Sequence, residues 1–408
     1  MTIYLDNGAT SFPKAPGVAE AMTKFLATDA ANPGRSGHRM AKNAEAMLER
    51  VRLKLCRFVN GPAPERVAFT LNCTDALNIA INGVLRGPTM AAAQLNAKHG
   101  GPKPHVITTV LEHNSVSRPL EAFAVRGLID LTRVGCDADG FVSPADIEKN
   151  LRPETLLVVM THASNVIGTV QDAAAVGAIV RKHGAIFCLD VAQTIGAVPV
   201  DMKELRADIL VFPGHKSLLG PTGTGAIVLG ERCPSPSEEV EDHTRFWSWR
   251  EGGTGGDSKT PVHPAQMPYA LEGGTPNTVG IAGLEAGLDY VIKQGADKLI
   301  THERALCQRL ISRLGADERF RILGSKDVSR RVGAVSVVVR GFEEHPMNVG
   351  MILDDSFDIA VRPGLHCSPY AHKAMGTFPD GALRISPGAF NTEADVDAVC
   401  DALEQIAM

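Results

Sequence analysis

Lys216 lies in a glycine-rich loop between two apolar runs, in the segment ADILVFPGHKSLLGPTGTGAIVLG. The loop is not a phosphate-binding P-loop, because the order GxxxxGK[ST] leading into a helix is absent. A lone lysine in such a loop is most often a solvated surface charge. A lysine held at the end of a sheet, with its pKa lowered by its surroundings, is instead suited to forming a Schiff base. Lys216 is therefore a candidate catalytic residue if other groups converge on it.

Three other polar residues each accompany the end of an expected strand. Asp190 ends AIFCLD, Asn165 lies in THASNVIGT, and His113 lies in TVLEHNSV. Ligands of parallel α/β sheets bind beyond the carboxyl ends of the strands, so these side chains are expected in one crevice. Asp190 could cap the helix that follows, or pair with the protonated ring nitrogen of pyridoxal phosphate. Asn165 could donate to the phenolic oxygen of that cofactor, and His113 could stack on its ring or be purely structural.

A phosphate site is expected in LNCTDALNIAI, where Cys73 and Thr74 stand at the start of a helix. The first turn of a helix has free backbone N–H groups, and the helix dipole adds positive potential there. Both features favour a bound phosphate group.

The loop RPGLHCSPYAH sets Cys367 beside His366 and five residues before His372. A metal site needs three or four convergent ligands, so we expect none here. A plain structural thiol is the second possibility. The third is a nucleophile, because Arg362 lies nearby, Gly364 gives the loop flexibility, and neighbouring cations raise the thiolate fraction of a cysteine. The nucleophile fits best.

Short apolar runs alternate with helical patterns from about residue 65 to 230, which predicts a mainly parallel sheet covered by helices on both faces. Helical periodicity returns at 280–315, and later strands with a last helix at 393–407 predict a smaller α+β part. The expected strands of the first part are 66–70, 105–110, 155–162, 185–190, 207–212 and 225–230, and its expected helices include 74–86, 115–126 and 172–183.

Two segments interrupt this order. Residues 87–105 are expected to form a surface excursion without a chemical role, and 231–279 a long loop region. Within the latter, 231–249 is either a solvated loop or a docking surface. In the second case Phe246, Trp247 and Trp249 would form an apolar patch, while an acidic run steers a basic partner.

The composition argues against several classes of protein. The chain has 408 residues, 44% of them hydrophobic, with a net charge of -5 and no basic block, so we expect no nucleic-acid partner. The N-terminus has no signal pattern, and no apolar run is long enough to cross a membrane. The eight cysteines form no CxxC pair. A reducing cytoplasm is the simplest expectation.

The order of motifs along the chain resembles the class V aminotransferase-like family. The resemblance is carried by YLDNGATS, the EH of LEHNS, HASNVIGT, LDVAQ, GHKSLLGPTGTG, EGGTPNT, RPGLHC and LRISPGAFNT, from residue 4 to 392. Within the family these motifs are most similar to group II cysteine desulfurases and selenocysteine lyases.

The resemblance implies an α/β fold, fold type I of the pyridoxal phosphate-dependent transferases. A large domain with a mainly parallel, seven-stranded sheet (16–284) would precede a smaller α+β C-terminal domain (285–408), joined by an N-terminal segment (1–15). It also implies a homodimer with pyridoxal 5'-phosphate as cofactor. The resemblance implies that Lys216, Cys367 and His113 are catalytic. The residues implied to contact the cofactor are Cys73, Thr74, His113, Asn165, Asp190, Gln193, His215, Lys216 and the other subunit's Thr275. Those implied to contact the substrate are Arg384, Arg362, Ala9 and Asn165.

The implied reaction converts L-cysteine to L-alanine, with a persulfide on Cys367 that passes to a thiol acceptor such as a sulfur-acceptor protein. The open alternatives are a selenocysteine lyase, another C–S lyase or an aminotransferase in which Cys367 is incidental, and a non-catalytic sulfur-relay scaffold. The chain also departs from the family pattern. Pro213 replaces a frequent serine that binds phosphate, Gly8 replaces the usual alanine, and Leu365 replaces the first histidine of the cysteine loop.

Overall fold

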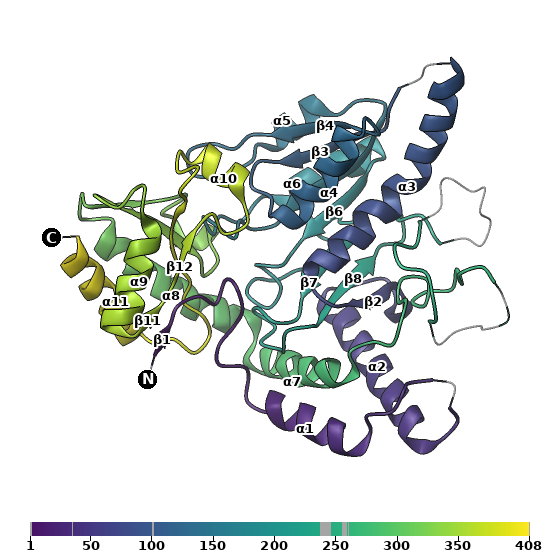
Figure 1. Ribbon diagram of the computed structural model, residues 1–408, viewed down its shortest axis with the longest axis horizontal. Helices are drawn as coiled ribbons and strands as arrows, with labels where there is room; N and C mark the ends of the chain where they lie inside the picture. Colours follow the sequence, from purple (N-terminus) through teal and green to yellow (C-terminus); the bar gives the residue numbers. More distant parts are fainter. Residues whose placement is uncertain are drawn as a thin grey trace.

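The computed structural model describes residues 2–34, 36–99, 102–236, 246–254, 259 and 261–407. Its centre is a seven-stranded sheet in the order β2-β8-β7-β6-β5-β3-β4 (Figure 1). Strands β4, β3, β5, β6 and β7 are parallel, and β8 runs antiparallel to both its neighbours. The strands are β2 (Val67–Thr70), β3 (His105–Thr109), β4 (Asp130–Val134), β5 (Thr155–Thr161), β6 (Ile186–Asp190), β7 (Ile209–Pro213) and β8 (Gly225–Leu229).

The expected mainly parallel sheet is thus confirmed, and β4 is the strand that the apolar runs did not reveal. Its burial changes from exposed at Asp130 to buried at Val134, as befits an edge strand. Because an edge strand is half-solvated, its sequence carries charged residues and lacks a continuous apolar run.

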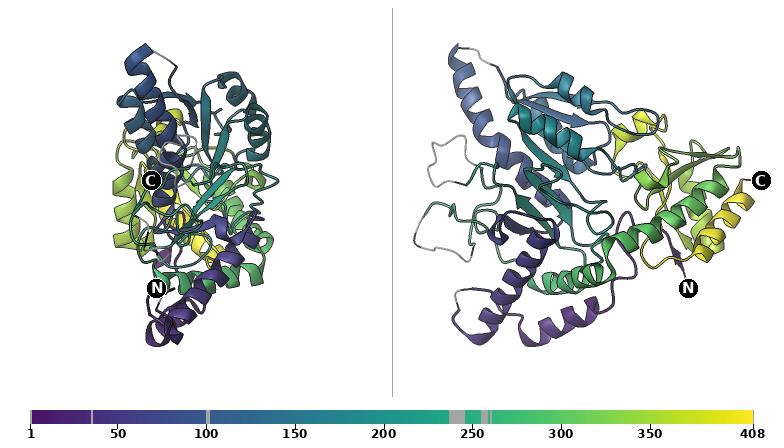
Figure 2. Two further views of the ribbon diagram at one scale, coloured as in Figure 1. Left: turned by 90° about the vertical axis from the view of Figure 1, so that its right-hand side faces the viewer. Right: turned by 180° about the vertical axis from the view of Figure 1, so that it is seen from behind.

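Helices cover both faces of this sheet. Neighbouring strand residues alternate between two apolar cores: Val106 and Leu157 face one core, and Ile107 and Val158 face the other. The side view in Figure 2 places α3 and α7 on opposite sides. The helices of this part are α1 (Val18–Thr28), α2 (Arg39–Phe58), α3 (Cys73–His99), α4 (Asn114–Val125), α5 (Pro144–Asn150), α6 (Ala173–His183) and α7 (Thr278–Gln294), with a 3-10 turn η1 (Pro64–Arg66).

Helix α3 is longer than expected. The predicted helix end at residue 86 was wrong, because α3 continues through Pro88 to His99 and projects beyond the sheet (Figure 1). Proline removes one backbone donor. The carbonyl that loses this donor is that of Val84, and the nearby hydroxyl of Thr89 donates to the carbonyl of Leu85 over 2.8 Å. Residues 87–99 of the segment 87–105 are therefore helical.

The aromatic residues of segment 231–249 do not form the exposed patch considered above. Phe246 is 1% exposed and Trp247 is 5% exposed, whereas Trp249 is 46% exposed. Phe246 packs on Gly83 of α3, where an added Cβ would lie 2.2 Å from its ring. Two of the three aromatic side chains thus belong to the interior. The acidic run at 238–242 lies outside the described residues.

A second, antiparallel sheet has the order β12-β13-β10-β9, and it confirms the smaller α+β part. The helical region expected at 280–315 is divided at Gly295, whose φ of 82° ends α7 and precedes α8. The elements are α8 (Ala296–Leu314), β9 (Phe320–Ile322), η2 (Val328–Arg330), β10 (Val335–Val339), α9 (Pro346–Phe357), β12 (Arg362–Gly364), α10 (Pro369–Ala374), β13 (Ala382–Ile385) and α11 (Glu393–Ile406), and β1 (Ile3–Tyr4) pairs with β11 (Ile359–Ala360).

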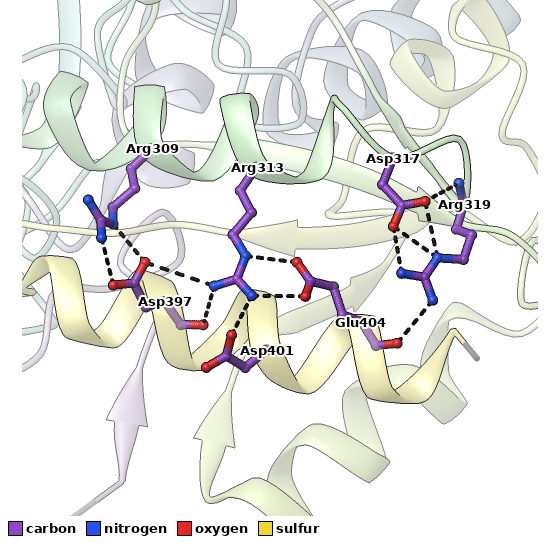
Figure 3. Close-up of polar contacts among 7 residues, drawn as sticks. All are labelled: Arg309, Arg313, Asp317, Arg319, Asp397, Asp401 and Glu404. Atoms are coloured by element: carbon purple, nitrogen blue, oxygen red, sulfur yellow. Dashed lines mark hydrogen bonds and ion pairs between the residues drawn. The ribbon is translucent and has the colours of Figure 1, made fainter.

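Ion pairs attach the last helix to α8 (Figure 3). Arg309 contacts Asp397 over 2.7 Å, and Arg313 contacts both Asp401 and Glu404. Single exposed pairs contribute little, but bidentate arginine pairs in one network contribute more. This network supplements the apolar core between α8 and α11.

The loop after β5 joins the two sheets. Ser336 of β10 donates its hydroxyl to the carbonyl of Val166 over 2.6 Å, and the amide of Val332 donates to Gly168 over 3.0 Å. Because Asn165 lies in this loop, its position depends on both sheets. Among the described helices, none is both long and apolar enough to cross a membrane.

Candidate active site

A cavity of about 330 Å³ opens at the carboxyl ends of β5, β6 and β7. Most of the residues predicted for the site line it, although they come from distant parts of the chain. They are Ala9, Cys73, Thr74, His113, Asn165, Asp190, Gln193, His215, Lys216, Arg362 and Arg384; Gly8, Asn72, Ser115, Thr161, Ala192, Pro213 and His366 complete the wall.

Lys216, which is half-buried, and Asp190, which is 4% exposed, are two opposite charges in this cavity. Burial lowers the pKa of the Lys216 ammonium, and the carboxylate of Asp190 opposes that shift. Burial likewise raises the pKa of Asp190, while the amide of Ala192, the charge of Lys216 and the thiol of Cys73 lower it. The Asp190 Oδ1 atom accepts from the Ala192 amide over 2.9 Å and from Cys73 Sγ over 3.5 Å. The lowered pKa favours the free amine of Lys216, although the nearby carboxylate of Asp190 favours the ammonium.

His113 lines the cavity as the N-cap of α4. Its Nδ1 accepts from the amide of Ser115 over 3.1 Å, which places the ring proton of the neutral histidine on Nε2. Burial lowers the pKa of His113 to about 4, and the positive charge of Lys216 acts in the same direction. The ring is therefore neutral at physiological pH and presents a flat apolar face, which suits stacking.

The part of the cavity around Cys73 and His215 is suited to an anion. Helix α3 begins there at Cys73, and His215 Nδ1 is a buried atom without a hydrogen-bond partner. The carbonyl of His215 accepts from the hydroxyls of Thr10 and Ser11 and from the ammonium of Lys14. Free helix amides and an orphaned imidazole nitrogen fit a phosphate group. Pro213 lines this end and, without an N–H, offers no donor.

Arg384 is 1% exposed and is held by two contacts. Its Nη2 atom lies 2.6 Å from Asp6 Oδ1, and its Nη1 donates to the carbonyl of Asn165 over 2.9 Å. Its Nε is buried without a partner, as is the hydroxyl of Ser386. Gly8 makes room for this arrangement, because an added Cβ would lie 3.1 Å from Arg384 Cζ.

The amides of Asn165 and Gln193 are engaged by protein. Asn165 Nδ2 donates to the carbonyl of His366 over 2.7 Å, and its Oδ1 accepts from the hydroxyl of Ser368 over 2.8 Å. Gln193 Nε2 donates to the carbonyl of Gly8 over 3.1 Å. Asn165 therefore binds the loop that carries Cys367 as well as lining the cavity.

Cys367 is exposed and does not line the cavity, although its neighbour His366 does. The two residues have φ values of 59° and 51°, both in the left-handed region. The carbonyl of Cys367 accepts from the amide of Asn114 over 2.7 Å. The loop thus ties the start of α4 to the cysteine.

Thr275 also lies away from the main cavity. It is exposed, its hydroxyl donates to Asn32 Oδ1 over 3.3 Å, and it lines a separate small pocket with Phe69 and Leu71. The structure therefore does not bring it near this chain's own Lys216 site.

Sequence reasoning missed Asp6, Glu112 and the partner of His366. Asp6 stands in YLDNGATS, three residues before Ala9, so its place in a predicted motif was an available signal. Glu112 is adjacent to His113 but entirely buried, and burial raises its pKa to about 8. Nothing local indicated that His372 would pair with His366.

The donor set fits pyridoxal phosphate. The cavity lining includes a lysine with a lowered pKa, a buried carboxylate, a neutral flat imidazole, and a helix N-terminus with the orphaned His215 nitrogen. Over the described ranges, no group of three or more His, Cys, Asp and Glu side chains converges as a metal centre would.

Comparison with known proteins gives a consistent result. Residues 3–399 match the family model of the class V aminotransferases. A probable cysteine desulfurase of Streptomyces coelicolor is 31% identical over 407 residues, covering 99% of this chain and 92% of the relative. A probable cysteine desulfurase of Pyrococcus abyssi is 32% identical, covering 99% and 94%. A cysteine desulfurase structure from Thermococcus onnurineus superimposes with a TM-score of 0.87 at 30% identity, covering 100% of this chain and 94% of that one.

Proposed function

The chain belongs to the class V aminotransferase family, and from this premise we propose that it is a pyridoxal phosphate-dependent cysteine desulfurase that converts L-cysteine to L-alanine. One observation carries the proposal for this chain's own residues. Lys216, Asp190 and Arg384 line a single cavity, and the loop of an exposed cysteine is bonded to its wall.

Different groups of the cavity lining would hold different parts of the cofactor. Asp190 would bind the ring nitrogen, and neutral His113 would stack on the ring. The first amides of α3, at Cys73 and Thr74, and the imidazole of His215 would bind the phosphate. When bound, pyridoxal phosphate supplies an electron sink for the carbanion at the substrate Cα.

The chain's own groups would then bind the substrate and move its protons. Arg384 would bind the substrate carboxylate, since its Nε has no protein partner. Arg362, Ala9 and Asn165 would line the same end. Lys216 Nζ would take the Cα proton, because burial lowers its pKa and favours the free amine.

Cys367 would accept the sulfur. Its thiolate attacks the substrate sulfur, an S–S bond forms, and the carbon–sulfur bond of cysteine breaks. The electron pair of the broken bond stays with the substrate β-carbon, which takes up a proton and leaves as part of alanine. The enzyme keeps a persulfide, whose outer sulfur then passes to a thiol acceptor such as a sulfur-acceptor protein. Because Cys367 does not line the cavity, its side chain would turn toward the substrate for this step, while the loop backbone stays bonded to Asn165 and Asn114.

We further propose a homodimer in the cytoplasm. Thr275 lies away from its own Lys216 site, which fits a role at the phosphate of the other subunit. All eight cysteines are free thiols, which fits a reducing compartment. Sedimentation of the holoenzyme as a monomer would contradict the dimer, and Thr275→Ala should weaken cofactor retention.

The decisive experiment compares Cys367→Ser with the wild-type holoenzyme. Alanine release from cysteine should fall at least 100-fold, while cysteine still perturbs the cofactor absorbance, since binding needs Lys216 and Arg384 but not the thiol. Cys136→Ser, a half-buried thiol outside the cavity wall, serves as the control and should keep activity within 2-fold. Full activity of Cys367→Ser would refute the assigned nucleophile.

A parallel experiment tests the cofactor site. Borohydride should fix the cofactor mass on the peptide with Lys216, and Lys216→Ala should abolish that adduct. An adduct that survives in Lys216→Ala would refute the assignment of the lysine.

A further inference from the structure

The loop of Cys367 contains two buried imidazoles, those of His366 and His372. His366 Nδ1 lies 3.2 Å from His372 Nε2, and the ring centroids are 5.2 Å apart. His366 Nε2 lies 2.9 Å from the carbonyl of Arg362, and His372 Nδ1 lies 2.8 Å from the hydroxyl of Thr377. His372 is 0% exposed and His366 is 4% exposed. Four polar groups therefore form one chain of hydrogen bonds from β12 to the end of α10.

The carbonyl of Arg362 determines which atom carries each proton along this series of hydrogen bonds. A carbonyl only accepts, so His366 Nε2 must carry a proton. A neutral His366 then has a bare Nδ1, so His372 must donate from Nε2. Its own Nδ1 is then bare and accepts from the hydroxyl of Thr377. Burial keeps both rings neutral, and the positive charges of Arg384 and Arg362 add to this effect at His366.

The backbone conformation of His366 and Cys367 is unfavourable and needs stabilising hydrogen bonds. His366 and Cys367 are consecutive left-handed residues, a conformation that costs roughly 1–2 kcal/mol for a residue with a Cβ. On the side of the large sheet, Asn165 binds the carbonyl of His366, and the amide of Asn114 binds that of Cys367. On the other side, the His366 ring is held by its hydrogen bond with His372. Hydrogen bonds therefore hold the two left-handed residues at both of their carbonyls and at the His366 side chain.

We propose that His372 is a positioning residue for Cys367. By donating to His366 Nδ1 it holds the His366 ring on the carbonyl of Arg362, and the fixed ring keeps the Cys367 backbone in its left-handed conformation beside the cavity. The proposal rests on the proposed role of Cys367 as sulfur acceptor. His372 touches neither the cavity nor the sulfur, so it acts through His366.

Two substitutions distinguish the effect of the His372 N–H donor from the effect of the volume of its ring. His372→Gln keeps an N–H donor near the position of Nε2, whereas His372→Leu fills similar space without a donor. Thr377→Val is a milder variant that removes only the hydroxyl at the far end of the chain.

Two readouts are needed on the holoenzyme. The first is backbone hydrogen exchange of the peptides containing Asn114 and residues 364–372. The second is the rate constant of Cys367 persulfide formation in a single turnover with cysteine, measured by mass spectrometry, together with the KM for cysteine.

We expect His372→Leu to exchange at least 10-fold faster at Asn114 and in the loop, and to form the persulfide about 10-fold more slowly with an unchanged KM. His372→Gln should stay within about 3-fold of wild type in both readouts, and Thr377→Val should lie between the two.

Wild-type exchange and persulfide formation in His372→Leu would overturn the proposal. So would equal losses in the Leu and Gln variants, because the donor would then not matter. If His372→Leu does not fold, Thr377→Val decides: wild-type exchange in that variant refutes the hydrogen-bond chain. Failure of the proposed function is a different result, namely full alanine release by Cys367→Ser whatever the exchange rates are.

Discussion

Asp6 Oδ1 lies 2.6 Å from Arg384 Nη2, and this ion pair joins residues 378 positions apart in the chain. The arginine side chain is 2% exposed and the aspartate side chain is 20% exposed. Burial lowers the pKa of Arg384, and the charge of Asp6 opposes that shift. The N-terminal segment thus supplies the counter-charge for the group proposed to bind the substrate carboxylate.

Asp6→Asn should therefore destabilise the protein. A nearly buried guanidinium without its counter-charge costs roughly 2–3 kcal/mol. The expected result is a lower urea midpoint with a higher KM for cysteine, since Arg384 loses one of its two anchors. Asp355→Asn, at an exposed carboxylate of α9, is the control and should leave both unchanged. Equal urea midpoints for Asp6→Asn and wild type would contradict the structural role of the pair.

Gly8→Ala should displace Arg384. The new Cβ would lie 2.9 Å from Ser386 Oγ and 3.1 Å from Arg384 Cζ, both too close for a methyl group. Because the guanidinium must shift, we expect the KM for cysteine to rise about 10-fold with a smaller change in kcat. Gly135→Ala, where nothing lies within 4 Å of an added Cβ, is the matched control. An unchanged KM in Gly8→Ala would mean that Arg384 does not bind the substrate carboxylate in this position.

Glu112→Gln should change the pH dependence of stability. Burial raises the pKa of Glu112 from its ordinary value of 4.5 to about 8, while the hydroxyl of Thr109 and the amide of Thr161 lower it. Between these values the unfolded chain is ionised here and the folded chain is protonated. The contribution of this carboxyl is thus fully present below about pH 4.5 and is lost as the pH rises to about 8, by roughly 1.4 kcal/mol per pH unit at most.

Glutamine has the same shape and does not titrate. The melting temperature of Glu112→Gln should therefore rise relative to that of wild type as the pH goes from 5.5 to 8. Parallel melting-temperature profiles for the two proteins would show that Glu112 is not protonated in the folded state.

Phe246→Ala should destabilise the protein by roughly 3 kcal/mol, because it leaves a cavity beside Gly83 in the core under α3. Trp249→Ala, at a side chain that is 46% exposed, should change stability by less than about 1 kcal/mol. Urea unfolding of the two variants side by side measures this difference. The reverse order would return Phe246 to the surface role that we considered from the sequence.

The sequence by itself determined the fold and the strand-end residues of the site. The apolar runs that end near Asn165, Asp190 and Lys216 are local patterns, and parallel strands bring their carboxyl ends to one edge. Because this rule needs only strand positions and order, it placed Asp190 and Lys216 in one cavity without any knowledge of distances. The motifs of the family indicated the cofactor because they lie on the loops that follow these strands.

Only the tertiary structure decided which partner each polar group takes. Asp6 faces Arg384, the amide of Asn165 binds the cysteine loop, and His372 faces His366 across a turn. A donor or acceptor in the sequence has many possible partners, and close packing selects one by geometry. Phe246 became a core residue in the same way, because Gly83 left space for its ring on a helix that no local pattern connects to it.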